Sequence, residues 1–355
     1  MRLVSTRYVE EGAFLARPVI NAAGQILLQA DIMLTSAYIE RLQRLGFDVV
    51  FIKDDRLDDI EVHIALSAQT REVAYRTVNS LMAQIESGNT KELELEFVRI
   101  TIQEMINDLL YSHDIITNLS EIQGFDDYTF HHSVNTTVLG LILGIASGYS
   151  EPKLLELGMG ILMHDVGKTK VPAQILNKPT PLTPEEFEEI KKHTLYGFDI
   201  LRQNRDLSLA AAHVALQHQE KWDGTGYPRG LKGSQIHEYG RVAAVADVYE
   251  ALTSKRIYRP ALQPYQAYEY IIANSGTHFE PRMLSIFAKH VAVYSNGCGV
   301  RLSNGQRGNV IKQNKSFPTR PYVRIFYQGE ETLTMPIEYN LAEHPALFIV
   351  EVDNR

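Results

Sequence analysis

The segment ILMHDVGKTKVP, residues 161–172, decides which fold this chain is expected to adopt. An apolar run with helical character ends there on an adjacent pair, His164 and Asp165. A neutral imidazole beside a carboxylate can hold a divalent metal ion, and the carboxylate can bridge to a second ion. Lys168 follows one turn later, so its ammonium can reach the same side of the helix end. Taken alone, the pair is better explained by a packed histidine and a surface aspartate.

Further histidines and an aspartate on both sides of this segment favour a metal site. Eight of the twelve histidines of the chain lie between His131 and His278. The positions of interest are His132, His164, Asp165, His193, His218 and Asp247, and their spacing places all but the adjacent pair on separate helices. Helical bundles build metal sites from facing side chains in this way. Most of these positions are flanked by apolar residues, where an unpaired polar group costs several kcal/mol, so packing alone does not explain the series.

The composition of the 355-residue chain limits the other classes of function. Its net charge is −8, which is not the basic balance typical of proteins that bind duplex nucleic acid. Cys298 is the single cysteine, so neither a disulfide framework nor a thiolate-rich zinc site is available. The longest apolar run, residues 138–146, is too short to span a bilayer, which needs about 20 residues. The first residues lack the apolar core of a signal peptide, and we expect a soluble cytoplasmic protein.

The residue pattern changes along the chain and predicts a multidomain, mainly α protein. Residues 1–60 are expected to form a small N-terminal accessory α/β module, and residues 296–355 a small C-terminal β domain. Residues 126–292 are expected to form a central all-α bundle, and residues 61–125 a helical linker. The apolar positions of this linker have two interpretations. They pack within one chain, or they pair with a second subunit and form a homodimer.

The helical region resembles the HD-GYP phosphodiesterases, a branch of the HD-domain metal-dependent phosphohydrolases. The strings that carry the resemblance are DDYTFHHSVN (126–135), GILMHDVGKTKVP (160–172), ILNKPTPLTPEEFEEIKKHTLYGFDIL (175–201), HQEKWDGTGYPRGLKG (218–233), RVAAVADVYEALTSKRIYRPAL (241–262) and THFEP (277–281). Together they cover nearly the whole of the bundle. The resemblance implies hydrolysis of the bacterial second messenger cyclic di-GMP to pGpG, or onward to GMP. It also implies a cluster of two or three metal ions, iron or manganese.

The resemblance also implies roles for individual positions. The metal ligands that it implies are His132, His164, Asp165, His193, His218 and Asp247, with Asp165 as the bridging ligand. Lys168 resembles the catalytic lysine that contacts the scissile phosphate, and the substrate-binding positions are Gly226, Tyr227, Arg256 and Arg259. Guanidinium groups suit this task because they match phosphate oxygens in pairs. In the implied mechanism a hydroxide held between the metals attacks phosphorus in line, and Lys168 helps to neutralise the developing charge.

Two positions depart from the family pattern. Gln219 stands where a second adjacent histidine is common, and an amide oxygen is a weaker ligand than an imidazole. We expect the second ion to keep Asp165, His193 and His218, with Gln219 or water completing its shell. Tyr128 stands where some members have a glutamate, and a phenol is mostly protonated at neutral pH, so we expect two ions rather than three.

Four other polar residues of the bundle have lesser expected roles. Glu250, three residues after Asp247, lies where an acidic residue is usual, and it is compatible with the site. His131 is expected to point away from the site because adjacent helical residues do not share a face. His213 and His278 are expected to be structural.

Three functions remain open at the level of the sequence. The first is an active cyclic di-GMP phosphodiesterase with a dinuclear site. The second is a catalytically weakened cyclic di-GMP sensor, which Gln219 favours. The third is an HD phosphohydrolase of another nucleotide, which the Gly226-Tyr227-Pro228 segment argues against because simpler HD enzymes lack it.

Overall fold

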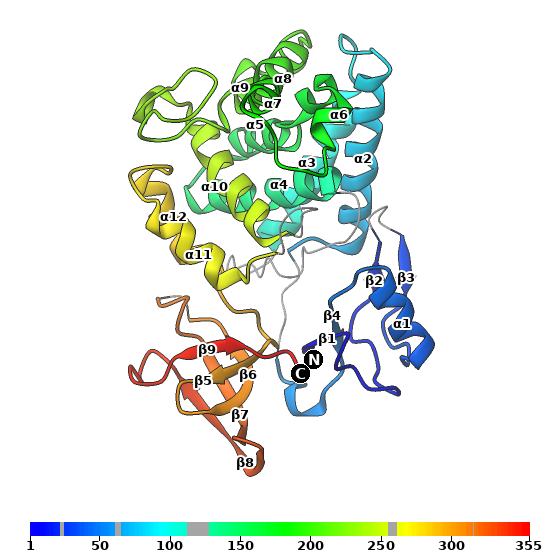
Figure 1. Cartoon of the computed structure of the whole chain (residues 1–355), viewed down its shortest axis with the longest axis vertical. Coiled ribbons are helices and arrows are strands. Elements are labelled where there is room, and N and C mark those ends of the chain that lie inside the picture. Colours follow the sequence, from blue (N-terminus) through cyan, green and yellow to red (C-terminus); the bar gives the residue numbers. More distant parts are fainter. Residues whose placement is uncertain (22–24, 61–64, 112–127, 255–260, 315) are drawn as a thin grey trace. The chain divides into compact units, whose positions relative to one another are not determined.

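The computed structural model describes residues 1–21, 25–60, 65–111, 128–254, 261–314 and 316–355 (Figure 1). Contacts within the chain divide it into two compact units. One unit is helical and holds the described parts of 65–115 and 127–288; the other holds those of 1–64 and 289–355. We describe each unit by itself. The finer division into four segments that the sequence suggests stays a prediction.

The helical unit is built from helices that enclose one central helix, α4. Its elements are α2 (Ala68–Glu86), α3 (Leu95–Tyr111), α4 (Tyr128–Ala146), α5 (Glu151–Leu162), the 3₁₀ helix η3 (Val166–Lys170), α6 (Ala173–Leu176), α7 (Pro184–Lys191), α8 (His193–Leu201), α9 (Leu209–Gln217), the 3₁₀ helix η4 (Gly233–Gln235), α10 (Glu238–Thr253), α11 (Pro264–Ala273) and α12 (Pro281–His290). Helix α4 packs against α2, α5 and α10, and α9 packs against α5, α8 and α10. Residues 131–144 of α4 are buried on every side, and residues 138–144 are apolar throughout, as expected of a helix segment in the interior.

Local sequence signals explain where α7 begins but not where it ends. The sequence Thr183-Pro184-Glu185-Glu186 predicts an N-terminal capping box, and Thr183 and Glu186 form it, with Pro184 in the first turn. The same signal predicts one helix that continues to about Arg202. That prediction is wrong at Lys192, a single residue with right-handed helical backbone at which α7 ends and α8 begins. The interruption makes His193 the first residue of α8.

The first residues of the chain form short strands around one helix. Strands β1 (Arg2–Ser5) and β4 (Val49–Ile52) pair antiparallel, as do β2 (Val19–Ile20) and β3 (Ile26–Leu28). Helix α1 (Ser36–Arg44) is capped by Thr35, a residue type typical of this position, whose side chain accepts a hydrogen bond from the Tyr38 N–H. Gly46 follows it with φ +84°, a conformation that favours glycine. A 3₁₀ helix, η1 (Asp55–Leu57), follows β4.

The last residues form the predicted small β domain. Strands β5 (Gly299–Leu302), β6 (Gln306–Lys312), β7 (Tyr322–Gln328), β8 (Glu331–Asn340) and β9 (Ile349–Val352) make an antiparallel sheet in the order β8-β7-β6-β5-β9. Val300, Val310 and Ile325 are fully buried on these strands. Within this unit the backbone of Leu3 bonds to the Gly297 carbonyl, so the first strand adjoins the start of the sheet. Among the described residues, no helix has the length and hydropathy to cross a membrane.

Candidate metal centre

The predicted ligands come from five places in the helical unit and meet in its interior. His132 lies on α4, His193 begins α8, and Asp247 lies on α10. The adjacent residues His164 and Asp165 follow α5, and His218 follows α9. All six side chains are buried: His132, His164, Asp165, His193, His218 and Asp247. The structure therefore brings together polar groups that lie far apart in the sequence.

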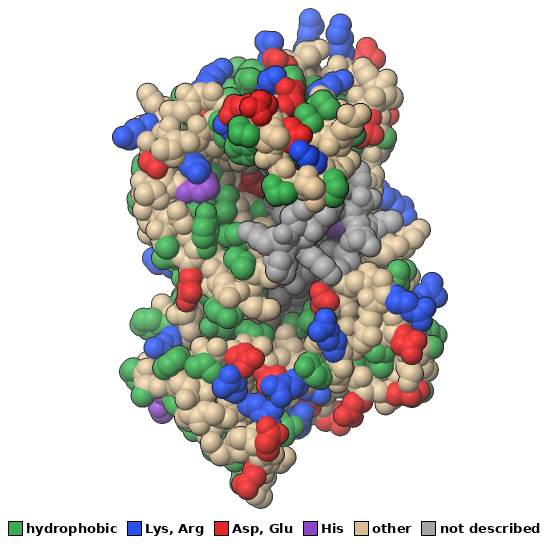
Figure 2. Space-filling model, viewed as in Figure 1, with side chains coloured by type: hydrophobic (Ala, Val, Ile, Leu, Met, Phe, Trp, Pro, Cys, Tyr) green, Lys and Arg blue, Asp and Glu red, His purple; other side chains and the backbone are tan. Residues whose placement is uncertain are grey.

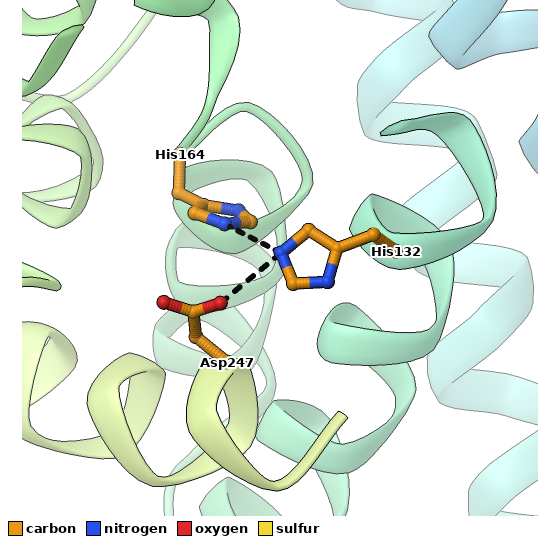
Figure 3. A group of neighbouring side chains, drawn as sticks. All are labelled: His132, His164 and Asp247. Carbon is orange, nitrogen blue, oxygen red and sulfur yellow. Dashed lines mark hydrogen bonds and ion pairs between the residues drawn. The ribbon is translucent and has the colours of Figure 1, made fainter. Parts of the chain in front are cut away.

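One half of this cluster, which we call the carboxylate side, consists of His132, His164 and Asp247. The Nε2 atom of His132 lies 3.1 Å from Asp247 Oδ1 and 3.2 Å from His164 Nε2 (Figure 3). Ligand atoms of the three residues all lie within 4.8 Å of one another. This spacing suits the coordination of a single cation.

The other half, which we call the imidazole side, consists of His193 and His218, whose Nε2 atoms are 3.2 Å apart. Asp165 lies between the two sides. Its Oδ1 is 3.5 Å from His193 Nε2 and 3.8 Å from His218 Nε2. Its Oδ2 is 3.4 Å from His164 Nε2 and 3.7 Å from His132 Nε2. Each oxygen of this carboxylate therefore faces a different half of the cluster.

Backbone carbonyls hold three of the four imidazoles by the nitrogen that points away from the centre. Nδ1 of His164 bonds to Ile161 O at 2.7 Å, and Nδ1 of His193 bonds to Ile190 O at 2.7 Å. Nδ1 of His218 bonds to the carbonyls of Val214 and Ala215 at 3.1 and 3.0 Å. A carbonyl only accepts, so each Nδ1 carries the proton. Such second contacts fix the tautomer and leave Nε2 free to bind a metal.

The imidazole side fits a cation for a reason visible in its own geometry. Burial lowers the pKa of His193, and burial together with the neighbouring His164 and His193 lowers the pKa of His218 to about 3. Both rings are therefore neutral, with their protons on Nδ1. Two bare nitrogen lone pairs then face each other 3.2 Å apart in the interior. Neither can donate to the other, and a cation between them would satisfy both.

On the carboxylate side, the neighbouring charges raise the pKa of a histidine instead of lowering it. Burial by itself would lower the pKa of His132, but Glu250 and Asp247 raise it to about 10. The Glu250 carboxylate bonds to Nδ1 of this ring and also accepts from Ser254 Oγ at 2.5 Å. Burial opposes ionisation of Asp247, yet His132 holds the pKa of Asp247 below its usual range. This side is therefore anionic enough to attract a proton or a metal ion.

Lys168 lies where the sequence predicts it, on η3 beside the centre. Its Nζ is 2.5 Å from Asp165 Oδ2. Burial would raise the pKa of Asp165, but Lys168 and the surrounding imidazoles hold it well below its usual range. Gly167 makes this placement possible, because a Cβ there would lie 1.9 Å from the His193 carbonyl oxygen. The motif glycine thus lets η3 pack directly on the start of α8.

Gln219 reaches the edge of the cluster and contacts the carboxylate side. Its Nε2 donates a hydrogen bond to Asp247 Oδ2 at 2.9 Å, while Oδ1 of the same aspartate faces His132. The amide assignment follows from the partner, since an ionised carboxylate only accepts. The nitrogen end of this side chain is therefore engaged by Asp247.

The segment after α9 packs as a tight loop next to the cluster. A Cβ on Gly226 would lie 2.3 Å from the Lys221 nitrogen, so only glycine fits there. The Tyr227–Pro228 peptide bond is cis. The ring of Tyr227 lies edge-on to His193, with centroids 6.4 Å apart. Burial raises the pKa of Tyr227, and Asp247 and Asp165 add to the effect, so its hydroxyl stays protonated.

Three residues near the centre have contacts that the sequence does not predict. The sequence predicts only that Glu250 is compatible with the site, and in the structure Glu250 is the carboxylate partner of His132. Glu220 is buried, but it turns away from the cluster and accepts from the backbone N–H groups of Arg229 and Leu231 at 2.8 and 3.0 Å. Gly167 supports η3. The sequence carries a signal for two of these residues: Gly167 lies inside the motif at the end of a helix, and Glu250 lies one turn after Asp247.

The remaining predictions divide into those the structure describes and those it does not. His131 packs on the ring of Tyr75 with centroids 4.3 Å apart, which confirms a structural position. His213 packs on Phe198 at 5.0 Å, and the His278 ring stacks on the neighbouring Phe279. The predicted substrate-binding residues Arg256 and Arg259 lie outside the described residues. So does the side chain of Tyr128, although its backbone begins α4.

Comparison with known proteins identifies two families in the chain. Residues 126–283 match the HD domain, and residues 299–355 match a KOW domain associated with HD domain. A cyclic di-GMP phosphodiesterase of Pseudomonas aeruginosa is 34% identical over 66% of this chain and 56% of its own length. A cyclic di-GMP phosphodiesterase of Thermotoga maritima is 38% identical over 50% and 48%. A 3'3'-cGAMP-specific phosphodiesterase of Vibrio cholerae is 43% identical over 68% and 45%.

A solved structure supports the fold. An HDG"Y"P protein from Bdellovibrio bacteriovorus aligns over 81% of this chain and 96% of its own, with 17% identity and a TM-score of 0.53. The chain spans about half the length of the curated relatives it matches. The HD match covers the six clustered positions and the loop beside them. Residues 126–283 therefore match the HD domain family, and the relatives named as cyclic di-GMP phosphodiesterases agree with the HD-GYP resemblance seen in the sequence.

Proposed function

We propose that this chain is a metal-dependent phosphodiesterase that hydrolyses cyclic di-GMP to pGpG, with GMP as a further product. The observation that carries the proposal is Asp165, whose two oxygens face two separate sets of imidazole nitrogens. A carboxylate in that position can bridge two cations, and paired cations suit the cleavage of phosphate esters. Relatives that share this helical region carry the name cyclic di-GMP phosphodiesterase.

Two divalent ions, iron or manganese, fit the set of donors. His132, His164 and Asp247 would hold one ion, His193 and His218 the other, and Asp165 would join both. A mixture of imidazole and carboxylate suits iron and manganese, whereas the absence of thiolates in the set disfavours softer metals. Tyr128 in place of a glutamate favours two ions over three. Gln219 would contribute an amide oxygen only if its nitrogen kept the bond to Asp247.

The residues of the chain would divide the remaining work. When bound, the ions would supply Lewis-acid stabilisation of the phosphoryl oxygens. Lys168 is ion-paired to Asp165 at 2.5 Å, so its ammonium lies at the edge of the cluster, where it can contact the scissile phosphate. Tyr227 keeps its proton and can donate a hydrogen bond to the substrate. Arg256 and Arg259 would bind the other charges of the dinucleotide.

A second candidate substrate is 3'3'-cGAMP. The relative with that specificity is 43% identical to this chain, above the identity of the two cyclic di-GMP enzymes named here. A weakened enzyme that serves as a cyclic di-GMP sensor is the other alternative, because Gln219 replaces a common ligand.

We also propose a homodimer through residues 61–125, which sedimentation of the full chain would test.

Turnover of defined substrates tests the proposal. The protein would be purified without oxygen, loaded with Mn²⁺ or Fe²⁺, and incubated with cyclic di-GMP or 3'3'-cGAMP, and products would be separated by liquid chromatography. We expect pGpG from cyclic di-GMP, and no product from Asp165→Asn. Binding without product, together with turnover gained in Gln219→His, would favour the sensor. Faster turnover of 3'3'-cGAMP would reassign the substrate, and no binding of either dinucleotide would overturn the proposal.

A further inference from the structure

Helix α7 places one large aromatic side chain in solvent beside the candidate centre. Phe187 is 45% exposed, and α7 has no buried residue. A single exposed aromatic residue is normal on a protein surface. Phe187 differs in its position, because its ring meets Tyr227 edge-on with centroids 6.4 Å apart. The ring of Tyr227 in turn lies 6.4 Å from the ring of His193 on the imidazole side.

A positive charge lies over the same two rings. Nζ of Lys191 is 5.0 Å from the centroid of Phe187 and 5.6 Å from that of Tyr227. Phe187 and Lys191 are four residues apart on α7, so they share one face of the helix. Glu188 pairs with Lys191 at 2.6 Å, but that carboxylate is 67% exposed and holds the ammonium only weakly. In Figure 2 this end of the unit, over α7, mixes acidic, basic and hydrophobic side chains.

The position of α7 is well fixed for so exposed a helix. The capping box joins Thr183 to Glu186, and Lys178 Nζ bonds to both carboxylate oxygens of Glu186 at 2.8 and 2.6 Å. Phe187 is the next residue in the chain. An aromatic ring on an anchored element loses little freedom when a flat ligand stacks on it, which favours binding.

We propose that Phe187, with Lys191 above it, is a nucleobase-stacking subsite that extends from Tyr227 outward from the metal centre. The inference rests on the proposed function, since it assigns the ligand of this face as a base of the cyclic dinucleotide. Aromatic side chains bind bases of any sequence through their π faces, and a nearby ammonium favours the adjoining phosphate. Phe187 would determine how tightly the dinucleotide binds and would leave the reacting atoms untouched.

The test compares substitutions of Phe187 in the full chain. Equilibrium binding of cyclic di-GMP to the metal-free protein would be measured by calorimetry, and KM and kcat on the metal-loaded protein. We expect Phe187→Ala to raise Kd and KM by about 10- to 100-fold, the cost of one lost base stack, at unchanged kcat. Phe187→Trp should restore binding. Phe97→Ala on α3 is the matched control, because Phe97 is 62% exposed and should leave Kd unchanged.

One further variant separates stacking from packing. Phe187→Leu keeps an apolar group against Tyr227 but removes the ring, so stacking predicts a Kd close to that of Phe187→Ala. A Kd within about twofold of wild type in either variant would overturn the subsite. If wild type turns over the dinucleotide while Phe187→Ala binds normally, the subsite fails and the proposed function stands. If wild type binds without turnover and Phe187→Ala loses binding, the proposed function fails and the subsite stands.

Discussion

The two sides of the candidate centre are built from similar rings but differ in charge. On the carboxylate side, Glu250 and Asp247 raise the pKa of His132 to about 10. On the imidazole side, burial lowers the pKa of His218 to about 3, and the neighbouring imidazoles add to this effect, although Asp247 and Asp165 act in the opposite direction. The same side chain is thus driven in opposite directions by its neighbours. The difference teaches that the two sides would not bind a cation equally, and that Asp165 makes them interdependent.

Removal of the shared carboxylate charge should have the largest effect. Asp165→Asn keeps the shape but loses the charge that serves both sides, so we expect loss of both ions. Turnover should fall by far more than the ~100-fold loss that follows when a residue hydrogen-bonded to a metal ligand is removed. Elemental analysis of protein purified without oxygen would measure the metal content alongside turnover. Lys168→Met is the control, because it should lose turnover and keep the metal. Two ions per chain in Asp165→Asn would show that the sides bind independently.

Substitution of Glu250, the hydrogen-bond partner of His132, should weaken metal binding on the carboxylate side only. Glu250→Gln preserves a hydrogen-bond acceptor for His132 but removes the negative charge, so we expect about 10- to 100-fold weaker binding of one ion. Competition with a chelator, followed as two separate steps, would measure it. Ser254→Ala, which removes one bond to the same carboxylate, should have a smaller effect. Equal weakening of both steps would argue against a division into two sides.

A histidine in place of Gln219 should strengthen the binding of one ion. In Gln219→His the new imidazole supplies a better ligand than an amide, and we expect the weaker ion to bind about 10-fold more tightly. The same chelator titration measures this gain. Gln219→Ala serves as the comparison, since it loses the bond to Asp247 and supplies no ligand. An equal gain in both variants would mean that the bond to Asp247, not the missing ligand, limits the site.

The metal-free protein should show the charge difference as a modest dependence of stability on pH. The pKa of His132 is raised from 6.5 to about 10, so the stability it contributes is complete below pH 6.5 and is lost as pH rises toward 10. The pKa of His218 is lowered, so its contribution is lost as pH falls from 6.5 toward 3. Each proton changes the free energy of unfolding by at most about 1.4 kcal/mol per pH unit.

Urea unfolding in EDTA at several pH values would measure this dependence. His132→Gln should remove the alkaline decline and leave the acidic decline in place. A variant with the wild-type slope between pH 6.5 and 10 would contradict the assignment of charge to His132.

The amino-acid order was enough to predict which polar residues gather, because each of them stands in a motif of its own, and their role as metal ligands stays a prediction. His132, His164, Asp165, His193, His218 and Asp247 do gather, and Lys168 lies beside them. Local signals were equally sufficient for the cap of α7 and for the alternating strands of the C-terminal sheet. The cap and the strand pattern depend on neighbours within a few residues, so a single sequence contains them.

Only the tertiary structure decided how these groups divide into two sides. The two faces of Asp165, the partnership of His132 with Glu250 and the bond from Gln219 to Asp247 all join residues from separate helices. Glu220, two residues after His218, shows a local version of this: its carboxylate turns to the backbone of Arg229 and Leu231 in its own loop. Hydrogen bonds and metal ligation depend on distances of a few tenths of an ångström. Helix packing sets those distances, and the spacing of residues along the chain does not.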